Sequence, residues 1–174
     1  MIIRTMHDRI EGDFGVVAEY KAGLSRWKSW LLTIARDGRV MRKVDQEEEA
    51  SHVKTLSKEE MNALRTKIKQ ADSFNLEPRY WDASTCQSTL TLIVVKKRKP
   101  FSTLVYGYYY LKNNEDVKRF LVVWRELLTL VPSPNPEDRP DIYDPLTWTF
   151  HRGKWGVNAL TATEASNATA PPPQ

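Results

Sequence analysis

The chain of 174 residues has few of the side chains that hold metals or form covalent bonds with substrates: one cysteine, Cys86, and three histidines, His7, His52 and His151. A single cysteine excludes an intramolecular disulfide and agrees with a reducing compartment. The histidines have no partner at metal-ligand spacing, so we expect no metal site. We interpret Cys86 as an unreactive buried or loop thiol, because a nucleophilic role would need a histidine base beside it in the fold.

Glycines and long apolar runs are also scarce. None of the seven glycines has the spacing of a phosphate-binding loop. No apolar run approaches the ~18 residues of a membrane span, and charged residues at 7–13 interrupt any apolar leader. We therefore expect a cytoplasmic protein that does not enter a membrane, is not an enzyme and needs no cofactor.

Basic residues are in modest excess, and they are unevenly spread. The net charge is +4. Residues 132–174 carry −2, with three basic and five acidic side chains, so residues 1–131 carry +6, with 23 basic and 17 acidic side chains. An excess of this size raises anion or nucleic-acid binding as a hypothesis.

The stretch 56–76, LSKEEMNALRTKIKQADSFNL, carries the clearest local signals. Ser57 is a favoured N-cap residue, and Glu60 three positions later completes a capping box. Apolar residues then recur at helical spacing over 61–71, and Pro78 bars continuation of the helix. The pattern predicts a helix with one apolar stripe, which must pack on a sheet or another helix.

Two stretches have the pattern of β-hairpins. In the first, an alternating strand over 27–35 meets an Asp-Gly turn signal and returns over 39–44. In the second, the run TLTLIVV at 89–95 is typical of a buried central strand. Its return strand is predicted over 101–110.

A second helix is predicted from Asn113 or Asn114 to about Val131, and its broad apolar surface indicates deeper burial than the first. The order hairpin, helix, hairpin, helix predicts an α+β fold. We expect an antiparallel sheet of four or more strands with both helices on one face. Residues 1–28 are ambiguous, although VVAEY at 16–20 has the composition of a short strand.

The composition changes at Pro132. Eight of the ten prolines lie in residues 132–174, so we assign a single α+β domain to residues 1–131 and a Pro-rich C-terminal extension after it. Residues 132–158 begin with the linker-like PSPNPEDRP and include an aromatic segment that we expect to dock on the body. The polar tail 159–174 is expected to be disordered.

The segments LTIARDGRV, LSKEEMNAL and TLTL follow one another within residues 30–131. In this order they resemble a group of small bacterial α+β domains of unknown function, which share an LTI..DG.V hairpin and an LS.EE...L helix. The pattern is similar, more distantly, to small inhibitors of thermolysin-like metalloproteases, although the Gly-Gly pair near the start of those inhibitors is missing. The resemblance implies an α+β fold and a non-enzymatic role, and it assigns no catalytic residue.

The sharpest binding candidate is the basic turn of the second hairpin together with nearby tyrosines. Basic side chains neutralise phosphates, and exposed rings stack on bases. Alternatively, the turn is simply solvated and discourages strand pairing, while alternate tyrosines face the core. The candidate residues are Lys96, Lys97, Arg98, Lys99, Tyr108 and Tyr110.

Two tryptophans of the extension, Trp148 and Trp155, form a second candidate. Aromatic side chains anchor protein interfaces, but docking of the extension on the body explains these residues as well. Asp82 lies near Arg79 and Trp81 in sequence, and we interpret it as a turn carboxylate rather than part of a polar pocket.

These signals favour a non-enzymatic interaction or binding module whose partner is another protein. The first alternative is nucleic-acid binding through the hairpin 96–110, and the second is a proteinaceous protease inhibitor. The exposure of the basic turn and of the tyrosine rings discriminates between the first two hypotheses.

Overall fold

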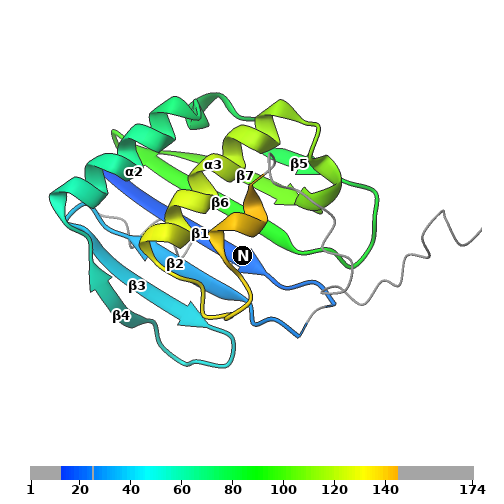
Figure 1. Ribbon diagram of the computed structural model, residues 1–174. Helices are drawn as coiled ribbons and strands as arrows, with labels where there is room; N and C mark the ends of the chain where they lie inside the picture. Colours follow the sequence, from blue (N-terminus) through cyan, green and yellow to red (C-terminus); the bar gives the residue numbers. More distant parts are fainter. Residues whose placement is uncertain (1–12, 25, 145–174) are drawn as a thin grey trace, which may run out of the picture.

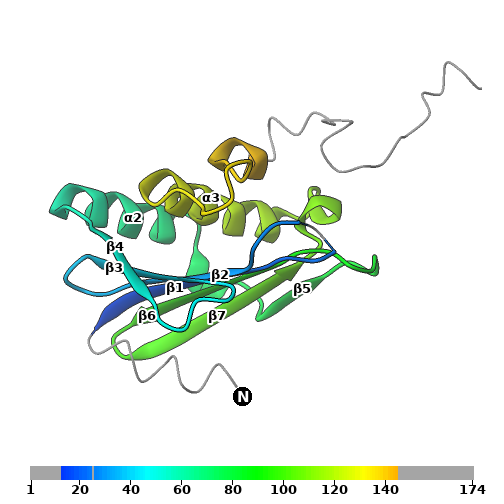
Figure 2. The same ribbon diagram turned by 90° about the horizontal axis from the view of Figure 1, so that it is seen from below.

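The computed structural model describes residues 13–24 and 26–144. They form a seven-stranded sheet with two α-helices on one face (Figure 1, Figure 2). The predicted α+β class is confirmed. The strands are β1 (Phe14–Lys21), β2 (Trp30–Ile34), β3 (Arg39–Val44), β4 (Ser51–Thr55), β5 (Arg79–Trp81), β6 (Thr89–Lys96) and β7 (Lys99–Tyr106); the helices are α2 (Lys58–Gln70), α3 (Glu115–Leu130) and the 3-10 helices η1 (Ser73–Asn75), η2 (Tyr108–Leu111) and η3 (Pro140–Tyr143).

The strand order is β4-β3-β2-β1-β6-β7-β5. Strand β1 lies in the middle and joins the two predicted hairpins, because it pairs with β2 on one side and with β6 on the other. All neighbouring strands are antiparallel except β5, which runs parallel to β7. The central strands β1 and β6 are buried along most of their length. For β6 the continuous apolar run predicts this burial.

Helix α2 begins with the predicted capping box. The Ser57 hydroxyl accepts a hydrogen bond from the Glu60 backbone N–H at 3.1 Å, and the Glu60 carboxylate accepts one from the Ser57 N–H at 2.8 Å. The apolar stripe is buried at Met61, Leu64 and Ile68. Local sequence therefore determines both where this helix starts and which face it buries.

Replacement of Ser57 by Ala is expected to lower the free energy of unfolding by about 1 kcal/mol, because the helix loses its N-cap acceptor. Urea denaturation measures this change. As a control, Ser102→Ala on the exposed surface of β7 should stay within about 0.5 kcal/mol of the parent. Equal effects of the two substitutions would contradict the role of the cap.

Helix α3 is the more deeply buried helix, as its broad apolar surface predicts. Its rings continue a stack that crosses the core: Phe120, Trp124, Trp30 and Tyr20 have successive ring-centroid separations of 5.8, 5.5 and 5.9 Å. We call these four residues the aromatic ladder. Because it runs from α3 through β2 to β1, it ties the helix layer to the middle of the sheet.

Residues 132–144, whose prolines suggest the start of a linker, pack on the body of the protein. The Asn135 side chain accepts a hydrogen bond from the Lys28 N–H at 2.9 Å and donates one to the Lys28 carbonyl at 3.0 Å. Asp138 and Tyr143 are buried. The side chains between the prolines make these contacts, so proline content alone misleads here.

Three other elements differ from the prediction. Strands β4 and β5 form outside the two predicted hairpins, in stretches for which no strand was predicted. The predicted strand 101–110 ends at Tyr106, because Gly107 takes a φ of 67° and the chain continues as η2. Trp148, Trp155 and the predicted tail 159–174 lie outside the described residues.

Candidate functional site

The structure separates the two parts of the predicted hairpin site. The basic turn joins β6 to β7, whereas Tyr108 and Tyr110 follow the far end of β7. At the rise of a β-strand, the eight residues of β7 span roughly 23 Å. The basic residues and the tyrosines therefore lie at opposite ends of the sheet. We call these the basic end, where β6 finishes and β7 begins, and the aromatic end, where β7 finishes.

At the basic end, Lys97 and Arg98 form a tight turn in which both take positive φ, 50° and 63°. The four cations of the turn are exposed. The ammonium of Lys96 lies 4.3 Å from the centroid of the Phe74 ring, and that of Lys99 lies 5.2 Å from the centroid of Phe101. Each phenyl face therefore stabilises a cation of the chain itself.

Helix α2 adds a further cation to this end. The Arg65 guanidinium lies 4.6 Å from the centroid of the Phe14 ring. The carboxylate of Asp13 is the nearby counter-charge, 3.9 Å from Arg98 and 4.0 Å from Arg36. These are exposed pairs at the limit of ion-pair distance, so they leave most of the positive charge available to solvent.

The two predicted tyrosines differ in exposure. Tyr108 is buried, with its ring centroid 5.0 Å from that of Tyr143, and burial raises the pKa of its hydroxyl. Tyr110 is 56% exposed and packs edge-on against Tyr109. Of this predicted pair, then, Tyr110 alone presents its ring to solvent.

Large apolar side chains gather at the aromatic end. Among the described residues, those with the greatest exposure are Leu24 at 87%, Trp81 at 57% and Tyr110 at 56%. They come from three separate segments: the β1–β2 connection, the last residue of β5, and η2. The strand pairing explains why the three segments share one end of the sheet. Tyr106 at the end of β7 pairs with Trp81 on one side and with Thr89 on the other, and Thr89 pairs in turn with Lys21 at the end of β1.

The loops of the aromatic end approach one another closely. The Leu24 N–H donates to the Cys86 carbonyl at 3.2 Å. A Cβ on Gly23 would lie 2.2 Å from the same oxygen, so only glycine permits this approach. Gly107 similarly faces the Asp82 side chain, 3.2 Å from an added Cβ. These contacts hold the β1–β2 connection and the end of β7 against the loop that follows β5.

Trp81 is held in a defined orientation although it is exposed. Its ring stacks on that of Tyr106, with centroids 4.1 Å apart and planes 14° from parallel. The Arg79 guanidinium lies 5.5 Å from the Trp81 ring centroid. The Tyr106 hydroxyl in turn accepts a hydrogen bond from the Gln87 N–H at 3.1 Å. Trp, Tyr and Arg are the residue types that contribute most to binding at protein interfaces.

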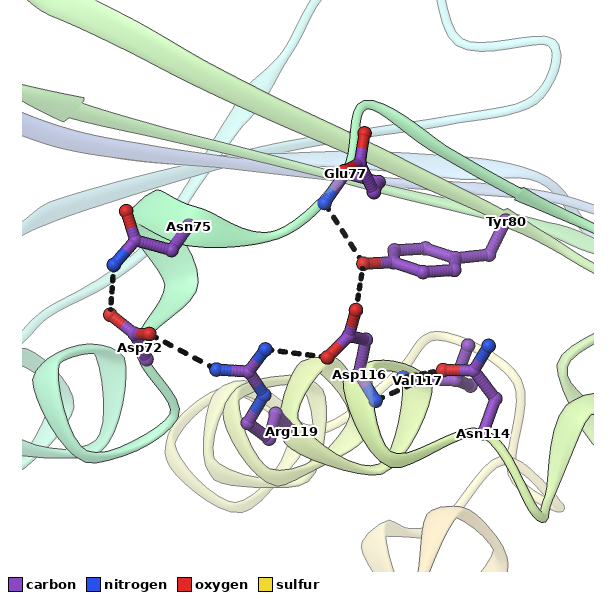
Figure 3. Close-up of polar contacts among 8 residues, drawn as sticks. All are labelled: Asp72, Asn75, Glu77, Tyr80, Asn114, Asp116, Val117 and Arg119. Atoms are coloured by element: carbon purple, nitrogen blue, oxygen red, sulfur yellow. Dashed lines mark hydrogen bonds and ion pairs between the residues drawn. The ribbon is translucent and has the colours of Figure 1, made fainter.

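The Tyr80 side chain points toward Asp116 on α3 (Figure 3), and this contact fixes which face of the sheet each side chain of β5 occupies. The Tyr80 hydroxyl donates to the Asp116 carboxylate at 2.8 Å and accepts from the Glu77 N–H at 2.9 Å. Asp116 also pairs with Arg119, which reaches Asp72 at 3.1 Å. Because successive side chains of a strand point to opposite faces, Tyr80 faces α3 while its neighbours in β5 face away from the helices.

The charge of Asp116 strengthens its hydrogen bond with Tyr80. The hydrogen bond from Arg119, followed by that from Tyr80, holds the pKa of Asp116 below its usual range. Burial raises the pKa of Tyr80. The carboxylate is therefore charged and the phenol neutral at pH 7, which is the combination that the hydrogen bond needs.

A buried carboxylate, Asp138, lies beside Trp30 and Tyr143 in the core, and no sequence pattern indicates it. It is 4% exposed, and burial raises its pKa to about 6. Part of this rise in pKa is offset by the nearby polar groups of Ser133, Tyr143 and Trp30. Neither carboxylate oxygen, however, has a hydrogen bond of regular geometry within the described part of the chain.

Other predicted features have local roles. As expected of a turn carboxylate, Asp82 accepts a hydrogen bond from the Ser84 N–H at 2.8 Å. Cys86 is an exposed thiol in a loop. Within residues 13–24 and 26–144, no three His, Cys, Asp or Glu side chains are placed to hold a metal ion, and no helix there has the length and apolar character needed to cross a bilayer.

Trp81 is not among the candidate binding residues that the sequence predicts. The one signal that could have found it is weak: in the three residues of β5, a buried Tyr80 lies between the exposed Arg79 and Trp81. The aromatic end offers rigid, exposed rings and a guanidinium, which suit noncovalent contact with another macromolecule.

No protein family matches the sequence of this chain, and no curated protein matches it either.

Proposed function

We propose that this protein is a non-enzymatic binding module and that its partner is another protein, bound at the aromatic end. The observation that carries the proposal is the position of Leu24, Trp81 and Tyr110, which come from three segments and are exposed at one end of the sheet. Exposed apolar groups that cluster in this way mark interaction sites. Trp81 is the expected anchor, because its stacking on Tyr106 limits the entropy that it loses on binding.

A photo-cross-linking amino acid in place of Tyr110 tests this proposal. In extracts of the source cells we expect a discrete cross-linked protein, and Trp81→Ala should reduce its yield about tenfold or more. The matched control carries the same amino acid in place of Lys97, at the basic end, where no such product is expected. Cross-linking at position 110 that is unaffected by Trp81→Ala would contradict the proposal.

The basic end supports a second candidate function, nucleic-acid binding. The specific observation is that the four exposed cations of the turn lie at the same end as Arg65 and Arg36, where the Asp13 carboxylate pairs with Arg98 and Arg36 at the limit of ion-pair distance. Because the phenyl faces there already contact cations of the chain, binding would depend on phosphates rather than on stacking of bases.

A filter-binding titration with single-stranded oligonucleotides at two salt concentrations decides between the candidates. Phosphate contacts predict binding that weakens steeply with salt, and Lys97→Ala with Arg98→Ala should lower both the affinity and the salt slope. Lys58→Ala with Lys67→Ala on α2 is the matched control. The protein-binding proposal predicts at most weak, sequence-blind binding that these substitutions barely change, and no measurable binding at low salt would exclude the nucleic-acid function.

A further inference from the structure

The outer edge of β5 has backbone groups that do not face the sheet. The β5–β7 ladder uses the Pro78 carbonyl, which accepts from the Leu104 N–H at 3.0 Å, and the Asp82 N–H, which donates to the Tyr106 carbonyl at 3.3 Å. In a parallel pair, alternate residues of a strand bond to the same neighbour. The N–H and C=O groups of Arg79 and Trp81 therefore point away from β7, along the edge of the sheet.

The opposite edge is protected in a way that β5 is not. Strand β4 pairs with β3 through an irregular register between Val40 and Met41, and its Lys54 is bound to Glu60 at 2.8 Å. Bulges and lysines are common means of blocking the addition of another strand. At β5 the equivalent positions carry an exposed tryptophan and an exposed arginine instead.

The side chains of β5 add specificity to this edge. Arg79 and Trp81 lie on the face of the sheet away from α3, because Tyr80 between them bonds to Asp116. Arg79 has no carboxylate within ion-pair distance among the residues that the structure describes. A strand that is paired with this edge would place its own side chains about 5 Å from the Trp81 and Arg79 side chains.

We infer that the partner binds as an extended peptide segment, which adds to the sheet along β5 with an apolar side chain on the Trp81 ring and a carboxylate beside Arg79. This inference rests on the proposed function and names the form of its ligand. Backbone hydrogen bonds to Arg79 and Trp81 would give register, and the two side chains would select the sequence. Because β5 has only three residues, the Trp81 contact must supply much of the affinity.

The test uses the full chain as bait for a displayed library of linear peptides, followed by titration of one selected peptide against four proteins: the parent, Trp81→Ala, Arg79→Ala and Arg79→Pro. Proline at 79 removes an N–H that does not bond to β7, and proline is tolerated at a sheet edge. Arg79→Ala is its matched control, because it removes the same guanidinium but keeps the N–H. Urea midpoints confirm that each variant is folded.

We expect the selected peptides to combine apolar and acidic residues. Arg79→Pro should weaken binding about tenfold beyond Arg79→Ala, and Trp81→Ala should weaken it at least as strongly. Equal affinities for Arg79→Pro and Arg79→Ala would overturn edge addition, as would a failure to select any peptide that depends on Trp81. The proposed function fails separately, if cross-linking at position 110 does not depend on Trp81.

Discussion

At pH values above about 7, Asp138→Asn is expected to raise the free energy of unfolding by about 3 kcal/mol. The pKa of Asp138 is raised by burial from 3.8 to about 6, so the folded protein holds a proton there that the unfolded chain has already released. Above both values the folded state must keep a charged carboxylate in a site that is only 4% exposed. Asparagine has a similar shape and carries no charge.

The sign of the pH dependence follows from the direction of this shift. Because the folded pKa is the higher one, the stability that Asp138 contributes is fully present below about pH 3.8 and is lost as the pH rises through about 6. The parent should therefore lose stability relative to Asp138→Asn across this window, and the two should become similar near its acidic limit. The neighbours Tyr108 and Tyr143 remain neutral throughout, because their pKa values are also raised by burial.

Urea denaturation at several pH values measures the difference between the two proteins. Asp141→Asn is the matched control: it removes the same charge from the same segment, but Asp141 is exposed and pairs with Arg139 at 3.2 Å on the surface. This control should follow the parent within about 0.5 kcal/mol at each pH. Parallel curves for the parent and Asp138→Asn would show that Asp138 is not the group responsible.

The parts of the fold that could be predicted depend on short-range signals. The capping box of Ser57 and Glu60 lies within one helical turn, so local sequence alone specifies the start of α2. Alternation within β2 similarly identifies the buried positions Leu32 and Ile34. In each case the residues that decide the structure are close together in the chain.

Strand β5 could not be predicted, because its three residues are too few for a periodic pattern. Its parallel pairing with Leu104 to Tyr106 brings together segments that are more than twenty residues apart. Tyr80 joins β5 to Asp116 on α3, which is a tertiary contact without a sequence signature. The exposure of Trp81 follows from these long-range contacts.

The candidate site was divided by the structure for a related reason. Residues 96–110 are continuous in sequence, so the sequence predicts that the basic turn and the tyrosines belong to one binding site. In space, however, a strand separates its own two ends, and Gly107 ends β7 before the tyrosines begin. Leu24 and Trp81, from other segments, are the residues that the strand pairing places at the same end of the sheet as Tyr110.

Trp124→Ala is expected to lower the free energy of unfolding by about 3–5 kcal/mol, because it removes one of the two inner rings of the aromatic ladder and leaves a cavity between α3 and β2. This is a large fraction of the roughly 5–15 kcal/mol that stabilises an ordinary domain. Trp124→Phe should cost less. It keeps an aromatic ring, and it removes an indole N–H that has no hydrogen-bond partner in the described structure.

Trp81→Ala makes the same chemical change at an exposed position and is the matched control. Because Trp81 is 57% exposed and loses mainly its stacking on Tyr106, we expect a cost of about 1 kcal/mol or less. Urea denaturation of the three variants and the parent measures the differences. A cost for Trp81→Ala close to that of Trp124→Ala would mean that Trp81 stabilises the fold; a small cost, combined with loss of the cross-linked partner, would leave binding as the reason for an exposed tryptophan at this edge.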